Sequence, residues 1–295
     1  MSVKNGINIF KKKSKKNRKT YCSPKTRNNK YTCFTKNSLL KIIKEWNKQS
    51  DAQKIKFSEK ESVPKLWNKI NHKLNDKCHG EWCWIQQEFI KNMGDSEIKD
   101  TFRPKTPRDW YQNRNEWLST LDIENAVKQY EKVHPDFVFI GAVPIDFDYE
   151  YSMGKCIVDE LCKMNLGSNV RNNKKKVGIV FNLDRHDQSG SHWVAMFIDM
   201  YKDKIYYFDS YGEKPPKEVS ILANRLVKQG KEIDRNMEYK VNKVRHQYKN
   251  SECGVYCINF IISLLEGKSF EDVTENKIDD DTINLERDFY FSPSM

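Results

Sequence analysis

Two cysteines four residues apart, Cys253 and Cys257, lie in the stretch "NSECGVYCINFIISLLEG", where a polar loop meets a long apolar run. The apolar run predicts a helix that begins near Cys253. A cysteine at a helix N-terminus lies beside free backbone N–H groups and the positive end of the helix dipole, and both stabilise a thiolate. Cys257 lies one turn deeper among apolar residues. This asymmetry favours Cys253 as a nucleophile, although a metal pair, a redox pair and two core cysteines are alternatives.

A cysteine nucleophile needs a base, and the base needs an acceptor that orients it. Of the six histidines, His192 stands at the start of a predicted strand in "GSHWVAMFIDM", and the next predicted strand, in "IYYFDSYG", ends at Asp209. The start of one antiparallel strand lies beside the end of the next, so His192 and Asp209 are expected to be neighbours. A lone histidine in a buried strand is more often a core residue. The inference therefore depends on the order His, Asp, Cys taken together.

Acyl transfer also needs hydrogen-bond donors aimed at the oxygen on which negative charge develops. Gln247 lies six residues before Cys253, in the loop that leads into the predicted helix. Its side-chain amide is a candidate donor, together with the backbone N–H of Cys253. Gly254 has no side chain, and we expect it to let the backbone of a substrate approach the nucleophile.

The positive charge of the chain is concentrated at its N-terminal end. Residues 1–30 hold eleven lysines and arginines and no acidic residue, which equals the net charge of +11 for the whole chain. A run of like charges with few apolar residues predicts a disordered basic arm. Any DNA contact is expected in this arm, and a solvated tail without a partner is the alternative.

The helices and strands that position these residues are predicted in two parts of the chain. Residues 31–99 predict a helical module, with helices in "SLLKIIKEWNK", "SVPKLWNKINHKL" and "CHGEWCWIQQEFIKNMG". Residues 100–116 contain two prolines and many polar residues, which indicates a linker.

Residues 117–295 predict a catalytic domain of α+β class. An amphipathic helix is followed by a strand in "FVFIGAVPIDF", where Pro144 indicates a sheet edge or a strand end. Three nearly continuous apolar strands follow, in "KKVGIVFNLD", "SHWVAMFIDM" and "KIYYFDSYG", as expected of central strands covered on both faces. A helix, a short strand in "EYKVNKVRH" and the helix from Cys253 complete the domain. This order predicts a central mixed β-sheet flanked by helices.

No apolar run reaches the length of a membrane span, and the N-terminal residues lack the apolar segment of a secretory signal. We therefore expect an intracellular protein with no membrane contact, in which all eight cysteines are thiols. The stretch "HKLNDKCHGEWC" groups His72, Cys78, His79 and Cys83. Their spacing matches no common zinc finger, so neither a metal site nor a cofactor is expected.

The motifs "SHWVAMFIDM", "YYFDSYG" and "RHQYKNSECGVYC" together resemble the ubiquitin-like-protein protease family, which includes the SUMO proteases and adenovirus protease. The resemblance covers residues 117–291 and is greatest to the capsid-maturation proteases of large cytoplasmic DNA viruses such as asfarviruses and poxviruses. It implies the fold of that family, with His192 as general base, Asp209 as its orienting acceptor, Gln247 as oxyanion donor and Cys253 as nucleophile. Some viral relatives carry Asn in place of the Asp.

Two tryptophans carry the resemblance further. In SUMO proteases, the tryptophan after the histidine and another in a "WLND"-like motif enclose the Gly-Gly of the substrate. Trp193 follows His192 here, and "WLSTLDI" supplies Trp117, with "ST" in place of "ND". Two facing indoles leave room for a glycine backbone alone, which implies cleavage after Gly-Gly. Core packing is the alternative for each tryptophan.

The resemblance implies a cysteine endopeptidase that processes viral core polyproteins after Gly-Gly during virion maturation, at assembly sites in the host cytoplasm and in the virion. A deubiquitinase or SUMO-removing protease that acts on host conjugates is an alternative with the same site. An acyltransferase is another, because members of the same clan use a similar triad. An alternative of a different class is a non-catalytic structural protein associated with nucleic acid through its basic arm.

Overall fold

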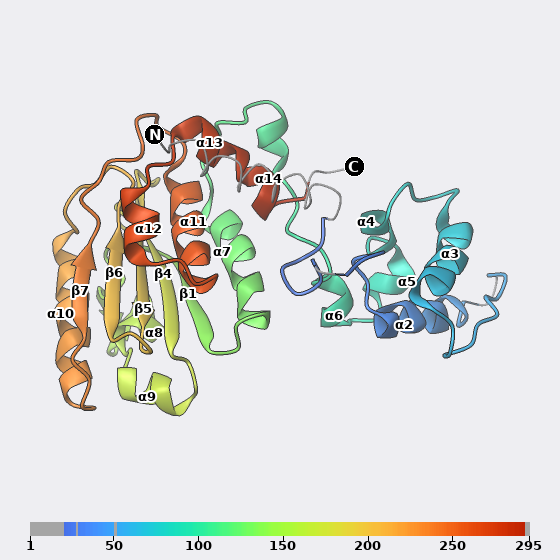
Figure 1. The fold of residues 1–295 in the computed structure, drawn as a ribbon, viewed down its shortest axis with the longest axis horizontal. Helices are drawn as coiled ribbons and strands as arrows, with labels where there is room; N and C mark the ends of the chain where they lie inside the picture. Colours follow the sequence, from blue (N-terminus) through green and yellow to red (C-terminus); the bar gives the residue numbers. More distant parts are fainter. Residues whose placement is uncertain (1–20, 28, 50–51, 293–295) are drawn as a thin grey trace, which may run out of the picture. The chain divides into compact units, whose positions relative to one another are not determined.

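The chain forms two compact units in the computed structural model, which describes residues 21–27, 29–49 and 52–292 (Figure 1). Unit 1 comprises residues up to 106 together with residues from 288 onward, and unit 2 comprises residues 107–287. Ser292 returns to unit 1 because its carbonyl accepts from the backbone N–H of Thr106 at 2.8 Å. The predicted linker therefore contains the boundary, whereas the last residues of the predicted catalytic domain belong to unit 1.

Unit 1 contains the helical module. Its helices are α2 (Lys36–Trp46), α3 (Val63–Leu74), α4 (Glu81–Trp84), α5 (Glu88–Lys91) and α6 (Ser96–Lys99). The Thr35 side chain caps α2 by accepting from the Ser38 N–H at 3.0 Å, and Phe34 stacks on Trp84 in the core. The third predicted helix consists of two single turns, because Gln87 has an extended backbone between α4 and α5.

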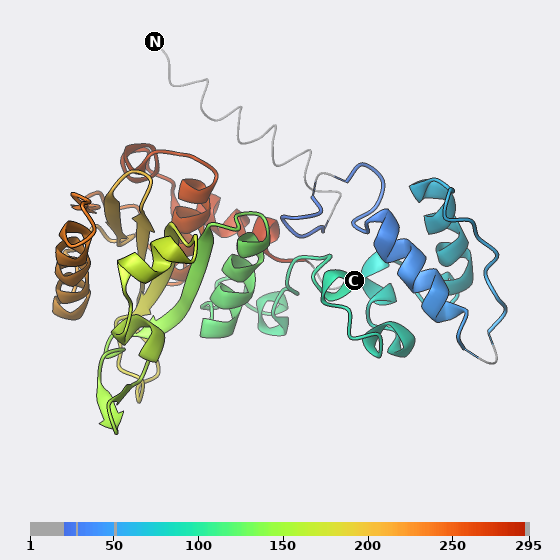
Figure 2. The ribbon, with the colours of Figure 1, turned by 90° about the horizontal axis from the view of Figure 1, so that it is seen from below.

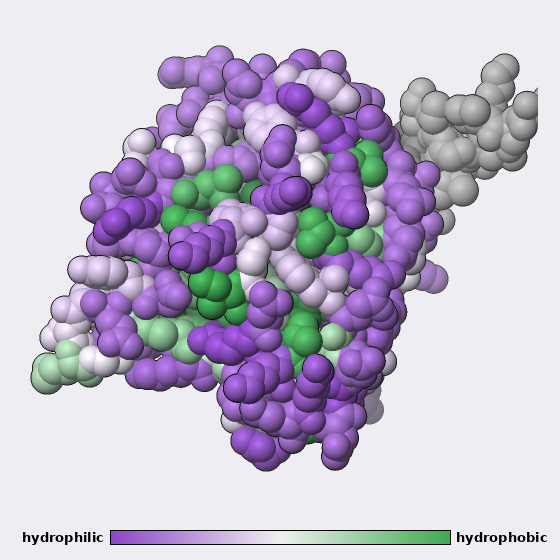
Figure 3. Space-filling view, turned by 90° about the vertical axis from the view of Figure 1, so that its left-hand side faces the viewer, coloured by the Kyte–Doolittle hydropathy of each residue, from purple (hydrophilic) through white to green (hydrophobic). Residues whose placement is uncertain are grey.

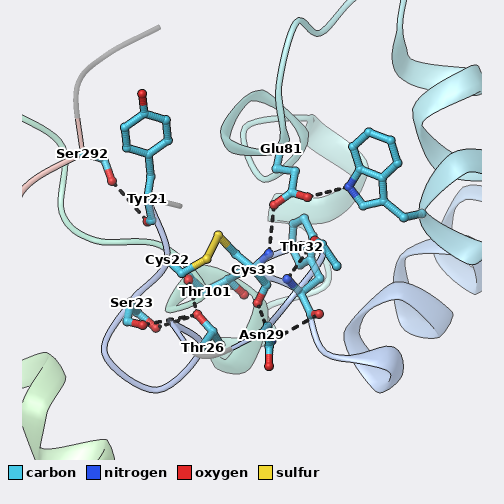
Figure 4. Close-up of a disulfide and its surroundings, with 12 residues drawn as sticks. Tyr21, Cys22, Ser23, Thr26, Asn29, Thr32, Cys33, Glu81, Thr101 and Ser292 are labelled. Carbon is cyan, nitrogen blue, oxygen red and sulfur yellow. Dashed lines mark hydrogen bonds between the residues drawn. A yellow bond between two sulfur atoms is a disulfide. The ribbon is translucent and has the colours of Figure 1, made fainter. Parts of the chain in front are cut away.

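The segment from Tyr21 to Lys30 packs into unit 1, so the prediction of a disordered arm up to residue 30 is wrong for its described part. Cys22 is fully buried and forms a disulfide with Cys33 (Figure 4). The Thr26 hydroxyl donates to the Thr101 carbonyl at 2.8 Å. These contacts anchor the segment despite its basic composition. Residues 1–20 and 28 lie outside the described residues.

Six of the eight cysteines are paired, which contradicts the expectation of eight thiols. The disulfides are Cys22–Cys33, Cys78–Cys83 and Cys156–Cys162. Local turns bring the paired Cα atoms to 5.0, 5.4 and 6.3 Å, within the range that a disulfide spans. The expectation of thiols was based on the cellular compartment, which gives no information on the distance between two cysteines. The pairing also removes Cys78 and Cys83 as zinc ligands, and no cluster of three or more His, Cys, Asp or Glu residues in the described chain could hold a metal ion.

Unit 2 is built on a mixed five-stranded sheet in the order β1-β4-β5-β6-β7. The strands are β1 (Phe137–Pro144), β4 (Lys176–Asn182), β5 (Trp193–Asp199), β6 (Lys204–Phe208) and β7 (Glu238–Val241). β4, β5 and β6 pair antiparallel, and the two edge strands pair parallel to their neighbours. Pro144 ends the edge strand β1, as its missing N–H predicts.

Helices cover both faces of this sheet (Figures 1 and 2). On one face lie α7 (Thr120–Lys128), α11 (Cys253–Leu265) and α12 (Phe270–Glu275), and on the other α8 (Asp159–Cys162), α9 (Leu166–Arg171) and α10 (Lys217–Lys231). Successive strand residues point to opposite faces. Phe208 stacks on Phe260 of α11 at 4.9 Å, whereas the preceding Tyr207 belongs to the core beneath α10. This two-sided burial accounts for the continuous apolar strands.

The remaining elements are short. They are the hairpin β2 (Glu150–Ser152) and β3 (Lys155–Cys156), the 3-10 helices η1 (Arg108–Tyr111) and η2 (Gln129–Lys132), and the C-terminal helices α13 (Asp280–Leu285) and α14 (Arg287–Tyr290). No helix among the described residues has both the length and the apolar character needed to cross a membrane. On the face that carries α10 and β7, the hydrophobic residues drawn in colour lie in small separate groups among hydrophilic ones (Figure 3).

Candidate active site

The β5–β6 hairpin brings His192 and Asp209 together, as the strand pattern predicts. Ala195 pairs with Phe208, and this register places Asp209 beside the start of β5. His192 Nε2 and Asp209 Oδ1 are 2.7 Å apart. Both side chains are almost completely buried, with exposed fractions of 10% and 3%. A hydrogen bond in such surroundings holds the imidazole in a single orientation.

The second imidazole nitrogen, Nδ1, is left for Cys253, the candidate nucleophile, because Nε2 is bonded to Asp209. Burial lowers the pKa of His192, but the hydrogen bonds with Asp209 and with Cys253 outweigh burial and raise this pKa from 6.5 to about 9. His192 therefore carries a proton at neutral pH. The carboxylate on one side and the sulfur on the other both stabilise the imidazolium.

Cys253 is the first residue of α11, where the helix dipole and the free N–H groups of the first turn surround its side chain. Cys257, one turn deeper, is the second free cysteine of the described chain. Burial raises the pKa of the Cys257 thiol well above its ordinary value, so Cys257 stays neutral. The helix thus gives the two cysteines opposite surroundings.

Gln247 is completely buried, with its amide fixed at both ends. Its Oε1 accepts from the Ser210 hydroxyl at 2.6 Å, and its Nε2 donates to the Lys249 carbonyl at 2.8 Å. One amide N–H remains for an oxyanion. Ser210 directly follows Asp209, so a single short segment positions both the histidine's acceptor and the candidate oxyanion donor. Sequence reasoning missed Ser210, because its contact lies 37 residues away.

Further hydrogen bonds join the Asp209 segment to the loop that carries Gln247. The Asn242 side chain donates to the Asp209 carbonyl at 2.8 Å. The backbone N–H groups of His246 and Gln247 both donate to the Ser210 carbonyl, at 2.8 and 2.9 Å. Asn242 was not predicted, and an asparagine in a polar segment carries no signal that identifies such a role.

Asp280, on α13, holds the same loop from the other side. Its Oδ2 accepts from the backbone N–H groups of Tyr248 and Lys249, at 2.9 and 3.0 Å. Its Oδ1 lies 3.3 Å from the Tyr256 hydroxyl of α11. The loop that carries Gln247 is therefore held against α11, and the sequence contains no local signal for this contact either.

Two buried charged residues, Glu252 and Arg287, lie beside Cys253. Glu252 precedes Cys253 and accepts from the Ser251 hydroxyl at 2.6 Å and from the Asn284 amide at 3.2 Å. Arg287 is 1% exposed, lies over the Trp110 ring at 4.4 Å and donates to the Ser251 carbonyl. Burial lowers the pKa of Arg287 to about 10, which still leaves it charged at neutral pH. Its positive charge offsets the negative charge of the Glu252 carboxylate next to the sulfur.

Both candidate substrate-binding tryptophans, Trp193 and Trp117, lie next to Leu118. Trp193 is buried, and its indole N–H donates to the Leu118 carbonyl at 3.0 Å. Trp117 precedes Leu118 and is 39% exposed. A Cβ on Gly254 would lie 3.0 Å from Leu118 Cβ and 3.4 Å from Trp193 Cδ1. Leu118 and Trp193 therefore fill the space into which a side chain at position 254 would extend, and the role of Gly254 in substrate access stays a prediction.

The assembled groups are those that acyl transfer through a thioester requires. The Cys253 sulfur, the candidate nucleophile, lies at a helix N-terminus and is hydrogen-bonded to a protonated imidazole, which is held by a carboxylate. A fixed amide in the adjoining loop and the first backbone N–H groups of α11 supply donors for a developing oxyanion. Cys257 is the one other free thiol in the described part of the chain, and its neutral, buried side chain lacks such an arrangement.

Comparison with known proteins places these features in context. The family model described as "Ulp1 protease family, C-terminal catalytic domain" matches residues 163–291. The chain is 33% identical over 278 residues to "Putative thiol protease R355" of Acanthamoeba polyphaga mimivirus, which covers 88% of this chain and 89% of that protein. It is 26% identical over 222 residues to a cysteine protease of African swine fever virus, which covers 70% of this chain and 80% of that protein.

Among solved structures, the fold resembles that of the same African swine fever virus protease. The TM-score is 0.62 at 21% sequence identity, and the match covers 81% of this chain and 94% of that chain. At this level of identity the likeness concerns the fold. It confirms the predicted α+β architecture, with a mixed sheet flanked by helices and helices in the N-terminal part.

Proposed function

This chain belongs to the Ulp1 protease family and is a cysteine protease, and from this premise we propose that it is an endopeptidase that cleaves proteins after Gly-Gly. We assign Cys253 as nucleophile, His192 as general acid and base, and Asp209 as the acceptor that orients His192. The observation that carries this assignment is the continuous hydrogen-bonded arrangement of these three side chains at the N-terminus of α11.

In the first half of the reaction, the Cys253 sulfur attacks the carbonyl carbon of the second glycine. The oxyanion accepts from the free amide N–H of Gln247 and from the backbone N–H of Cys253. His192 then gives its proton to the leaving amine, and the C–N bond breaks to leave a thioester. In the second half, a water gives a proton to His192 and attacks the thioester. The C–S bond breaks, the acid is released, and the sulfur is left as a thiolate beside a protonated His192, as at the start.

The Gly-Gly preference is supported by the two tryptophans. Trp193 lies against the first turn of α11, close to Gly254, and Leu118 links it to the half-exposed Trp117. Flat aromatic faces at the entrance to a nucleophile leave little room for any Cβ on the bound chain. A Trp193→Ala variant should therefore lose selectivity for glycine at the two positions before the cleaved bond, and unchanged Gly-Gly cleavage would contradict this role.

We propose viral structural or core polyproteins as the substrates, processed at assembly sites in the host cytoplasm and in the virion. The viral sources of the relatives support this choice. Removal of ubiquitin-like proteins from host conjugates is the second candidate, because some of the African swine fever virus relatives are described as a "SUMO-1 cysteine protease".

The test compares the wild-type protein with a Cys253→Ala variant on candidate viral core polyproteins and on ubiquitin-like fusions. Each substrate is supplied with its Gly-Gly and with Ala-Ala in its place. Cleavage of the Gly-Gly polyprotein alone, and by the wild type alone, is the expected result. Cleavage by the Cys253→Ala variant, or equal cleavage of the Ala-Ala form, would refute the proposal, and exclusive cleavage of the fusions would favour the second candidate.

We also propose that the basic N-terminal segment contacts DNA. This proposal is supported by the composition of residues 1–30, which contain eleven basic residues and no acidic residue. Eight of the eleven basic residues lie in residues 1–20. Since residues 21–30 contribute to unit 1, the matched deletion removes residues 1–20 only. DNA binding should be salt-sensitive and should disappear in this deletion variant. Binding that survives the deletion would contradict the proposal.

A further inference from the structure

Three side chains beside the catalytic histidine take no part in the mechanism above. Tyr211 stacks on His192 with ring centroids 4.6 Å apart. The Arg245 guanidinium lies over the Tyr211 ring at 5.3 Å and over the Tyr248 ring at 4.7 Å. Tyr248 is 63% exposed, so this group extends from the catalytic base to the surface. We call Tyr211, Arg245 and Tyr248 the Arg245 cluster.

The Arg245 cluster is fixed to the catalytic machinery at several points. The Tyr211 N–H donates to Asp209 Oδ1 at 2.9 Å, and its hydroxyl donates to the Lys249 carbonyl at 3.2 Å. Arg245 Nε donates to the carbonyl of Gln247 at 2.8 Å. The cluster therefore connects the residue that orients His192 with the loop that carries the candidate oxyanion donor. A ligand would meet side chains that are already in place.

The Arg245 guanidinium has hydrogen-bonding capacity to spare. A guanidinium carries five N–H donors, and the Gln247 carbonyl accepts from Nε only. Arg245 is exposed and forms no ion pair within the described part of the chain. Its Cζ lies over two tyrosine rings. A planar guanidinium with free Nη hydrogens suits a carboxylate, which it can bind through two parallel hydrogen bonds.

The position of the Arg245 cluster beside His192 indicates which part of the substrate it contacts. The leaving amine takes its proton from His192, so the residues that follow the cleaved bond must pass the imidazole. Tyr211 covers that imidazole. Trp193 and Gly254, in contrast, are packed against Leu118, on the segment proposed to enclose the two glycines.

From this geometry we propose that the Arg245 cluster binds the substrate residues that follow the cleaved bond and selects an acidic side chain among the first two. The proposal rests on the endopeptidase function proposed above and adds its specificity on the leaving-group side. Arg245 would pair with the carboxylate, and Tyr211 and Tyr248 would contact the chain that carries it.

The test uses peptides with identical residues up to and including Gly-Gly, followed by two Glu, two Ala or two Lys residues. The kcat/KM ratio for the Glu and Lys peptides is measured for the wild type and for Arg245→Ala, Arg245→Glu and Lys243→Ala. Lys243 is an exposed cation in the same loop and serves as the matched control. Because the ratio is taken within one protein, any loss of folded enzyme cancels.

The wild type should prefer the Glu peptide roughly tenfold, as expected for a charge-assisted pair in partly exposed surroundings. Arg245→Ala should bring the ratio close to one, Arg245→Glu should favour the Lys peptide, and Lys243→Ala should keep the wild-type ratio. A merely structural role of Arg245 would lower kcat/KM for all three peptides equally and leave the ratio unchanged.

Equal cleavage of the three peptides by the wild type, or an unchanged ratio in Arg245→Ala, would overturn the subsite while the endopeptidase function stands. A failure of the wild type to cut any Gly-Gly peptide or polyprotein would refute the endopeptidase function, and the subsite with it. The two failures are thus distinguished by the Ala peptide, which reports cleavage without a charge after the cut.

Discussion

Replacing Asp209 by Asn tests the electrostatic balance at His192. The pKa of His192 is raised from 6.5 to about 9 against the effect of burial. A rise of this size corresponds to on the order of 3 kcal/mol of preference for the imidazolium. The asparagine side chain would keep the shape of the carboxylate but remove its charge. With burial still acting and only Cys253 left to oppose it, we expect the pKa of His192 to fall by roughly 1–3 units.

The sign of the accompanying change in stability follows from the direction of the shift. A pKa that is higher in the folded than in the unfolded protein stabilises the fold fully below pH 6.5, and this stabilisation is lost as the pH rises through about 9. The free energy of unfolding of the Asp209→Asn variant should therefore lie below that of the wild type at pH 6. The two curves should converge above pH 9.

The assay is an NMR titration of protein with 13C-labelled histidine, combined with the pH profile of kcat/KM. His246 is an internal control: it is bonded to the Thr274 carbonyl, burial lowers its pKa, and its titration should be the same in both proteins. The variant should lose roughly 10²–10⁴-fold in kcat/KM, and its activity should decline at a lower pH on the alkaline side. If His192 titrates at the same pH in both proteins, Asp209 does not raise the pKa of His192 and the reasoning is wrong.

Three further predictions concern the nucleophile helix and the adjoining loop. Cys253 and Cys257 are both 1% exposed, so exposure alone does not separate them. Iodoacetamide should nevertheless label Cys253, at the helix N-terminus beside His192, and leave Cys257 unmodified by mass spectrometry, because burial raises the pKa of the Cys257 thiol; equal labelling would contradict the assignment. Gly254→Ala should lower kcat/KM and cost about 1–3 kcal/mol in urea unfolding, because its Cβ would lie 3.0 Å from Leu118. Gly212→Ala should also destabilise the protein by about 1–3 kcal/mol, because Gly212 has a φ of +74° and lies against the backbone of the loop that carries Gln247. If either variant unfolds at the same urea concentration as the wild type, the close packing at that glycine is refuted.

Local patterns in the sequence predicted much of the fold. The three apolar strands, the helix that begins at Cys253 and the mixed sheet all agree with the structure. Such patterns succeed because burial of a strand or helix face imposes a period on the residues that form it. The short helices α4 and α5 differ from the single helix predicted, because the extended backbone at Gln87 depends on packing in unit 1.

The described part of the basic arm and the cysteines show where composition misleads. Lys25 and Arg27 make the segment after Tyr21 look like the preceding run, yet a disulfide and the Thr26 hydrogen bond anchor it to unit 1. Composition averages over residues, whereas a single buried side chain can order a segment. Pairing of cysteines depends on Cα distances, and these become available only with the folded turns.

By itself, the sequence determined which side chains could perform the chemistry: a cysteine at the start of an apolar helix, a histidine and an aspartate at facing ends of two strands, and a glutamine before the cysteine. The tertiary structure alone decided how they are held. Ser210 fixes Gln247 across 37 residues, Asn242 holds Asp209 across 33 residues, and Asp280 braces the loop across more than 30 residues. Hydrogen bonds between loops depend on the register and packing of the elements that carry them, and no periodicity in the chain encodes that register over such separations.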